Sequence, residues 1–232
     1  MSRAVPPAAK ASAVRVKICG ITNWPDARAA LDLGAAWLGF NFCPLSPRSI
    51  SPAEAWSIRR RLPRSARIAG VFVNWTPRAI TTLSRALLLD AVQLHGDEGP
   101  RHVNDCARHQ EVFKAFRVGP GFRVDRLASY SAAAAFVLDG LRPGFYGGSG
   151  RTADWALACR AARYGRIFLA GGLSPENVAE AIREAQPYAV DVASGVESRP
   201  GKKDRTKMRA FFREVERASR ELPASARRNH AA

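Results

Sequence analysis

The sequence predicts a single-domain α/β protein with the architecture of a closed (β/α)8 TIM barrel. Short β-like runs alternate with helix-like segments, and this alternation occurs eight times over about 205 residues. One helix after each strand requires parallel strands joined by right-handed crossovers. Eight units of about 26 residues fit a closed barrel better than an open, doubly wound sheet.

Each expected strand is a short run rich in apolar and β-branched residues that ends near a polar or glycine residue. The expected strands are residues 14–19, 36–42, 67–74, 90–95, 111–118, 133–139, 166–171 and 188–194. The expected helices are residues 24–33, 52–61, 76–88, 98–109, 123–130, 152–163, 175–185 and 204–220. Ser51, Thr76 and Ser174 each precede a proline, a pattern that predicts a helix start at all three.

No composition break divides the chain, so we expect one catalytic domain over residues 14–220. Residues 1–13 lack the apolar stretch of a secretion signal and are expected to form a mobile leader. Residues 221–232 are expected to be a disordered basic tail. The segment "LRPGFYGGSG", residues 141–150, is too short for a linker and is interpreted as a working loop. Its glycine spacing and the absence of a lysine exclude a Walker loop and nucleotide hydrolysis.

Composition narrows the class of protein. No window approaches 18 uncharged apolar residues, which argues against a membrane span. The four cysteines show no C-x-x-C spacing, so we expect no zinc site, no disulfide framework and a reducing, cytoplasmic location.

The net charge of +16 raises the alternative of a nucleic-acid-binding protein. Residues 199–232 carry +7 and residues 1–17 carry +4, so most of the excess lies near the two ends of the sequence. A solvated charged helix or tail explains that distribution more simply, and we expect no nucleic-acid partner. Steep weakening of duplex binding with salt would discriminate the two readings.

The barrel prediction directs the search for function to the carboxyl ends of the strands, where barrel enzymes place their active sites. The residues at or just past those ends are Cys19, Asn41, Arg48, Asn74, His95, Arg117, Asp139, Gly171 and Ser194.

Two of these residues could move protons. Cys19 is either a buried small hydrophobe or a thiol placed for chemistry at a strand tip. Lys17 shares its strand face but lies about 7 Å deeper, so we expect no activation of the thiol by Lys17. Asp139 ends an apolar strand, where partial burial would raise the pKa of its carboxyl group and suit a general acid. Its alternative role is a helix cap or ion-pair partner.

Other residues suit the binding of anions. Arg48 lies on a proline-rich loop and suits bidentate recognition of a carboxylate, although a surface charge remains the alternative. The loops "AGGLSPENV" and "ASGVESRPG" contain Gly171, Gly172, Ser194 and Gly195, and they follow the seventh and eighth strands. Barrels commonly bind phosphate between those two loops through backbone N–H groups. His95 is interpreted as a site wall or structural residue rather than a catalytic one.

Taken together, these motifs resemble the phosphoribosylanthranilate isomerase family of tryptophan biosynthesis. The matching segments are "VKICGIT", "GFNFCPLSPRSI", "GVFVN", "VQLHGDE", "VLDGLRPGFYGGSGRTADW", "LAGGLSPENV" and "AVDVASGVESRPGKKD". They occur in order from about residue 14 to residue 205, so the resemblance covers nearly the whole chain.

The resemblance implies an isomerase that needs no cofactor and acts on N-(5-phosphoribosyl)anthranilate, a phosphorylated small molecule. The product would be 1-(2-carboxyphenylamino)-1-deoxyribulose 5-phosphate. It implies that Cys19 is the general base, Asp139 the general acid and Arg48 the partner of the anthranilate carboxylate. Gly171, Gly172, Ser194 and Gly195 would hold the phosphate. The enzyme would be a monomer or a homodimer.

Two positions depart from the pattern of the family. Cys43 stands where the family often has an aromatic residue, and Arg151 stands where lysine is common. Neither position carries the implied proton transfers. The alternative enzyme is another phosphosugar isomerase or epimerase on the same barrel; a metal-dependent epimerase would need His and carboxylate ligands at several strand ends.

Overall fold

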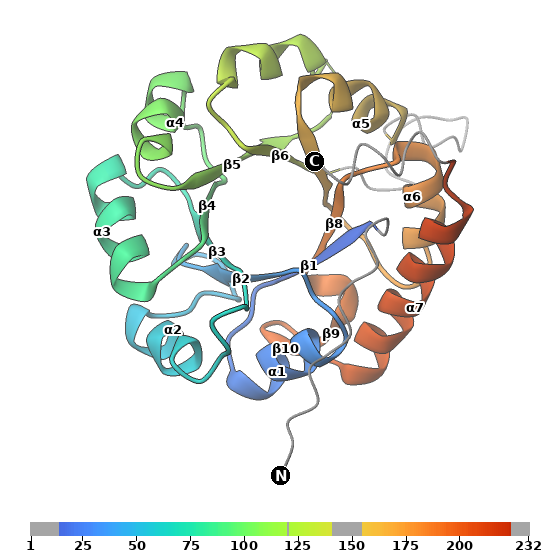
Figure 1. Ribbon diagram of the computed structural model, residues 1–232, viewed down its shortest axis with the longest axis horizontal. Helices are drawn as coiled ribbons and strands as arrows, with labels where there is room; N and C mark the ends of the chain where they lie inside the picture. Colours follow the sequence, from blue (N-terminus) through green and yellow to red (C-terminus); the bar gives the residue numbers. More distant parts are fainter. Residues whose placement is uncertain (1–13, 120, 141–154, 224–232) are drawn as a thin grey trace.

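The computed structural model describes residues 14–119, 121–140 and 155–223, and within them it forms a closed barrel of eight parallel strands. Each strand pairs with the next, and the first strand pairs with the eighth to close the ring (Figure 1). The strands are β1 (Arg15–Cys19), β2 (Trp37–Asn41), β3 (Ile68–Phe72), β4 (Ala91–Leu94), β5 (Glu111–Arg117), β6 (Ala135–Asp139), β7 (Arg166–Leu169) and β8 (Ala189–Val192). The predicted fold class is therefore confirmed.

Helices surround the ring of strands (Figure 1). They are α1 (Trp24–Asp32), α2 (Pro52–Arg59), α3 (Pro77–Leu87), α4 (Pro100–Ala107), α5 (Trp155–Ala161), α6 (Val178–Ala185) and α7 (Arg205–Glu221), with short 3-10 helices η1 (Val124–Tyr130), η2 (Ala162–Tyr164) and η3 (Ser194–Val196). The segment expected as a helix over 123–130 is thus a 3-10 turn rather than an α-helix. The leader expected over 1–13, the working loop over 141–150 and most of the tail lie outside the described residues.

Two of the three predicted helix starts are confirmed. The side chains of Ser51 and Thr76 each accept a hydrogen bond from a backbone N–H in the first turn of α2 and α3. The third prediction is wrong, because α6 is capped at Asn177, three residues after Ser174. The Asn177 side chain instead accepts a hydrogen bond from the N–H of Ser174, which closes a turn ahead of the helix.

A small element was not expected from the sequence. Residues Glu197–Arg199 (β9) and Lys202–Lys203 (β10) form a two-stranded antiparallel hairpin after β8. Its Lys203 and Glu197 side chains are buried, and both point toward the carboxyl end of the barrel. The hairpin therefore places charges beside the end of β1.

The strands separate two apolar regions. Outward side chains of the strands pack against the helices in one large core, while an inner cluster fills the lower barrel. Trp37, Phe113 and Phe168 are fully buried in that inner cluster and their rings contact one another in pairs. Polar residues replace the apolar ones toward the carboxyl ends, which leaves room there for a site.

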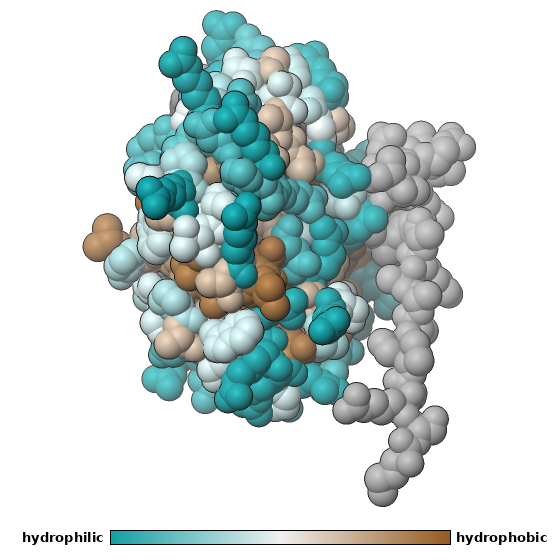
Figure 2. Space-filling view, turned by 60° about the vertical axis from the view of Figure 1, so that its left-hand side comes forward, coloured by the Kyte–Doolittle hydropathy of each residue, from teal (hydrophilic) through white to brown (hydrophobic). Residues whose placement is uncertain are grey.

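The outer surface is mostly hydrophilic. The face shown in Figure 2 carries mainly hydrophilic side chains around a small group of hydrophobic ones. Within the described residues, the large hydrophobic side chains that are exposed are Leu45, Trp56 and Leu88. No helix in the described part of the chain is long and apolar enough to cross a membrane.

Candidate active site

The carboxyl ends of the strands surround a pocket of about 780 Å³. Its lining includes Cys19, Asn41, Arg48, His95, Arg117, Asp139, Gly171, Gly172 and Ser194, all of them expected from the sequence. Gly195 is absent from the lining, and Asn74 lines a neighbouring pocket instead. The predicted proton-transfer and anion-binding residues are therefore brought together at one end of the barrel.

Cys19 is the last residue of β1, and its thiol sits over the backbone of the neighbouring strand. Gly39 of β2 is its partner in the strand register. A Cβ atom built on Gly39 would lie 2.8 Å from Cys19 Sγ and 3.0 Å from Cys19 Cα. The missing side chain at Gly39 thus leaves the space that the thiol occupies.

The positive charge of Lys17 acts on the thiol, which corrects the expectation that this lysine lies too deep to influence it. Burial raises the pKa of the Cys19 thiol, while the positive charge of Lys17 acts in the opposite direction; the net pKa is raised. The backbone of Lys17 is indeed two residues deeper. Its Nζ reaches Asp191, a residue of the pocket lining, so the depth of the backbone was the wrong measure.

Asp139 lies at the end of β6 and forms a hydrogen-bonded chain with two residues of β4 and the loop after it. Its Oδ2 lies 3.0 Å from His95 Nε2, and His95 Nδ1 lies 2.8 Å from Gln93 Nε2. If the Gln93 amide donates to Nδ1, then Nε2 carries the ring proton and donates it to Asp139. The chain fixes the orientation of the imidazole between an amide and a carboxylate.

The pKa of Asp139 is lowered, contrary to the expectation from burial alone. Burial does raise it, but the hydrogen bond and charge of His95, the N–H of Gly140 and the charge of Arg117 outweigh that effect. The pairing of His95 with Asp139 was not expected from the sequence, because the two residues are 44 positions apart. These contacts therefore hold Asp139 as a carboxylate.

Arg48 is fixed by a carboxylate that the sequence reasoning did not single out. Its Nε and Nη2 donate to the two oxygens of Glu197, at 2.7–3.1 Å. Glu197 also accepts from Lys203 Nζ at 3.0 Å. These cations lower the pKa of Glu197 although burial opposes them. The arginine fork is thus oriented at the pocket rim, with the remaining N–H groups of the guanidinium available for an anion.

Gly20 is required for this position of Arg48. Its φ of +72° is in the left-handed region, and a Cβ there would lie 2.7 Å from Arg48 Cδ. The glycine that ends β1 therefore turns the chain and also accommodates the arginine stem.

The two glycine loops differ in whether their glycines have backbone N–H groups free to bind a ligand. Gly171 and Gly172 have φ values of +90° and +72°, and the structure gives their N–H groups no hydrogen-bond acceptor among the described residues. A Cβ on Gly171 would lie 2.3 Å from Gly140 N. Gly195 packs against the neighbouring loop, since its Cβ would lie 1.9 Å from Leu173 O. Gly171 and Gly172 thus present backbone donors to the pocket, while Gly195 holds the two loops together.

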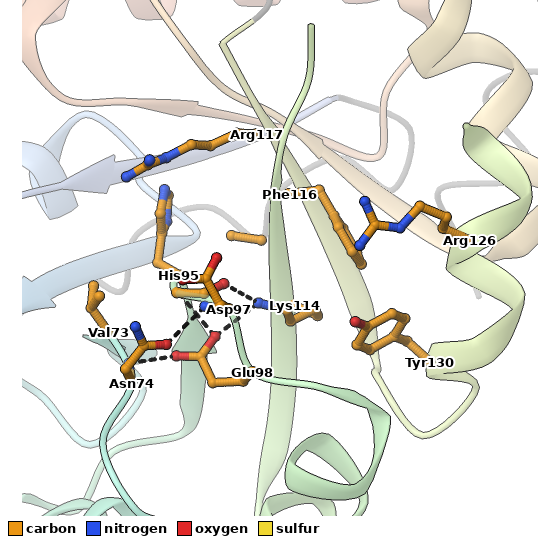
Figure 3. A pocket seen from close by; sticks show the side chains of 12 residues that line it. Val73, Asn74, His95, Asp97, Glu98, Lys114, Phe116, Arg117, Arg126 and Tyr130 are labelled. Atoms are coloured by element: carbon orange, nitrogen blue, oxygen red, sulfur yellow. Dashed lines mark hydrogen bonds and ion pairs between the residues drawn. The ribbon is translucent and has the colours of Figure 1, made fainter. Parts of the chain in front are cut away.

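A second pocket of about 270 Å³ adjoins the first at His95 and Arg117. Figure 3 shows the side chain of His95 rising toward Arg117, above a network centred on Glu98 and Lys114. Lys114 Nζ donates to Glu98 at 2.8 Å and to two backbone carbonyls, and Glu98 accepts from two backbone N–H groups. This buried network stabilises the loop that carries His95.

The residues that sequence reasoning missed share one property. Lys17, Asp191, Glu197 and Lys203 are buried charged residues whose partners lie on another strand, and the buried Gln93 bonds to His95 at the end of its own strand. A polar residue at an inward position of an otherwise apolar strand, such as Asp191 in "YAVDVAS", was the available signal. No group of three or more His, Cys, Asp or Glu side chains among the described residues is arranged to hold a metal ion.

Comparisons with known proteins agree on one family. The family model for N-(5'-phosphoribosyl)anthranilate isomerase matches residues 16–214. The N-(5'-phosphoribosyl)anthranilate isomerase of Pelobacter propionicus is 48% identical over 200 residues, which cover 86% of this chain and 94% of that protein.

Solved structures give the same result. The crystal structure of phosphoribosyl anthranilate isomerase from Thermotoga maritima has a TM-score of 0.79 and 43% identity, covering 88% of this chain and 98% of that one. A crystal structure of phosphoribosyl anthranilate isomerase in complex with reduced 1-(o-carboxyphenylamino)-1-deoxyribulose 5-phosphate has a TM-score of 0.79 and 39% identity, with the same coverage. The chain therefore belongs to the N-(5'-phosphoribosyl)anthranilate isomerase family.

Proposed function

We propose that this chain converts N-(5-phosphoribosyl)anthranilate to 1-(2-carboxyphenylamino)-1-deoxyribulose 5-phosphate by a cofactor-free Amadori rearrangement. Membership of the family supports the substrate. The observation that carries the mechanism is the presence of Cys19 and Asp139 in one pocket of about 780 Å³, on different walls of the same barrel mouth. A base and an acid so placed flank a sugar bound between them.

The acid acts first. Asp139 protonates the furanose ring oxygen, the bond from that oxygen to C1′ breaks, and a Schiff base forms. The acid needs a proton that the free carboxylate lacks. Solvent in the open pocket supplies that proton, and the hydrogen bond from His95, 3.0 Å away, orients the carboxyl group.

The base acts next. Cys19, as thiolate, removes the proton from C2′ and gives an enolamine, which tautomerises to the ketone. Atoms and charge balance, because the product is an isomer of the substrate. Gly171 and Gly172 bind the phosphate through backbone N–H groups, Ser194 lines the same side of the pocket, and Gly195 holds the two loops together. Arg48 binds the anthranilate carboxylate. Anchoring both ends of the substrate fixes the reacting carbons between acid and base.

The remaining features of the proposal follow from the same chemistry. A base that works as a thiolate needs a reduced cysteine, which is consistent with a cytoplasmic location. One solved structure is described as generated monomers of the dimeric phosphoribosylanthranilate isomerase from Thermotoga maritima, so we propose a monomer or a homodimer. Light scattering of the purified chain would distinguish the two states.

The test is a fluorescence assay that follows loss of the anthranilate ribotide. Wild type is expected to turn over, and Cys19→Ser and Asp139→Asn are expected to lose about 10²–10⁴-fold in kcat with modest changes in KM. Cys159→Ser is the matched control, because Cys159 is exposed on α5 and absent from the pocket lining. A fully active Cys19→Ser variant would contradict the assignment of Cys19 as the base. An inactive wild type would contradict the proposed reaction.

A further inference from the structure

A buried ion pair lies directly below the Cys19 thiol. Lys17 of β1 and Asp191 of β8 are partners in the strand register, and Lys17 Nζ donates to Asp191 Oδ2 at 2.6 Å. The side chain of Lys17 is 0% exposed and that of Asp191 is 5% exposed. An apolar pair of similar volume would often stabilise the barrel at least as well, so stability alone does not account for these two charges.

The ammonium group of Lys17 serves two partners. Besides its bond to Asp191 Oδ2, its positive charge acts on Cys19, which lies two residues further along the same face of β1. An ammonium has three N–H donors and can contact a carboxylate and a thiolate at once. The two partners compete for the same positive charge, because a stronger bond to one weakens the attraction to the other.

One carboxylate oxygen of Asp191 can accept a hydrogen bond from a molecule bound in the pocket. Its Oδ1 is buried and has no hydrogen-bond partner among the described residues, and Asp191 lines the pocket. A buried carboxylate oxygen without a donor is costly. A hydroxyl group of a sugar bound in the pocket would supply the missing donor.

The other charged groups around Cys19 are paired with partners other than the thiol. Lys203 from the hairpin donates to the Cys19 carbonyl at 2.6 Å and pairs with Glu197, which also binds Arg48. Across the pocket, Asp139 pairs with His95, and Arg117 lies next to Asp139 in the strand register. Of these cations, Lys17 shares the strand face of Cys19, and its charge acts on the thiol more strongly than that of Lys203.

We propose that Lys17 is a positioning residue that stabilises the Cys19 thiolate, and that Asp191 restrains Lys17 until its free oxygen accepts a substrate hydroxyl. This inference rests on the assignment of Cys19 as the base in the proposed function. The thiol proton leaves to solvent in the pocket, and Lys17 stays protonated throughout. Donation from the substrate partly neutralises Asp191, which strengthens the hold of Lys17 on the thiolate.

The test measures the reactivity of the thiol without substrate. Wild-type chain, Lys17→Met and Asp191→Asn are alkylated with iodoacetamide over a range of pH, and the Cys19 peptide is quantified by mass spectrometry. At pH 8, Lys17→Met is expected to slow alkylation of Cys19 by about tenfold, and Asp191→Asn is expected to accelerate it by a similar factor. The exposed Cys159 is the internal control and should react equally in every variant.

A purely structural role of Lys17 and Asp191 would not change the alkylation rate of Cys19 in opposite directions in the two variants. Loosening of the barrel would expose Cys19 in both variants and change both rates in the same direction. Equal directions, or unchanged rates, would overturn the proposal.

Lys17→Met leaves Asp191 as a buried unpaired charge and is the variant that is hardest to fold. The double variant Lys17→Met/Asp191→Asn removes both charges, and its comparison with Asp191→Asn isolates the effect of Lys17. The double variant is expected to react about tenfold more slowly than Asp191→Asn. Because no substrate is present, this result stands even if the turnover assay rejects the proposed reaction.

Discussion

The substitution Glu197→Gln tests the most heavily bonded carboxylate near the pocket. Glu197 is 4% exposed at its side chain and accepts from Arg48, Lys203 and the N–H of Gly201. Gln keeps the shape and one acceptor oxygen but removes the charge. Lys203, 0% exposed, would lose its counter-ion and keep neutral acceptors, which include the carbonyls of Cys19 and Ala193.

The expected loss of stability follows from that geometry. Breaking a buried ion pair costs about 3–5 kcal/mol, and the retained acceptor places this variant near 3 kcal/mol. With a urea m-value near 2–3 kcal/mol/M, the midpoint of unfolding falls by about 1 M. KM for the ribotide also rises, because Arg48 loses the carboxylate that orients it. Urea unfolding and steady-state kinetics measure the two effects.

The pH dependence gives a sharper criterion. The pKa of Glu197 is lowered in the folded chain, so its contribution is present above the ordinary pKa of a glutamate and is lost as pH falls through the folded value. The difference between wild type and Glu197→Gln should therefore shrink on acidification from pH 7. Asp32→Asn, which breaks an exposed pair with Arg28, is the control and should change stability by less than about 0.5 kcal/mol. A Glu197→Gln variant as stable as wild type at pH 7 would refute the reasoning.

Three further outcomes are expected. Gly39→Ala places a Cβ 2.8 Å from Cys19 Sγ and should displace the thiol. In the turnover assay, kcat is expected to fall by about 10²-fold. An unchanged kcat would mean that the position of the thiol is not critical. His95→Asn removes the group that lowers the pKa of Asp139, so the carboxyl signal of Asp139 should titrate at higher pH by ¹³C NMR, and an unchanged titration would contradict this assignment. Arg48→Lys keeps the charge but loses the fork, so KM should rise by about tenfold with kcat nearly unchanged, and a fall confined to kcat would argue against a binding role.

The fold could be predicted because its signals are local. Strand composition and the caps at Ser51 and Thr76 depend on neighbours within a few residues, and both are confirmed. The hairpin from Glu197 to Lys203 was missed because its strands are two and three residues long and carry charged side chains. Its stability comes from burial against the barrel, which no local pattern encodes.

The sequence predicted many of the residues that line the site, but it did not predict the charge interactions that shift their pKa values. A barrel places its strand ends together, so Cys19 and Asp139 were expected to share a pocket, and they do. The pKa of Asp139 was predicted in the wrong direction because His95 comes from another strand end. The influence of Lys17 was missed because its reach depends on the side-chain conformation inside the barrel. Such pairings follow from register and packing, which appear only in three dimensions.

The pairing of β1 with β8 determines when, during synthesis, the surroundings of Cys19 are completed. Lys17 and Asp191 are separated by 174 positions, and their bond forms only when the last strand closes the ring. At a synthesis rate of about 5–20 residues per second, Lys17 leaves the ribosome roughly 10–35 s before its counter-ion does. During that interval, the nascent chain holds the thiol of Cys19 and the ammonium of Lys17 without the walls that confine them. Reactivity of Cys19 in partly synthesised chains would therefore report on ring closure.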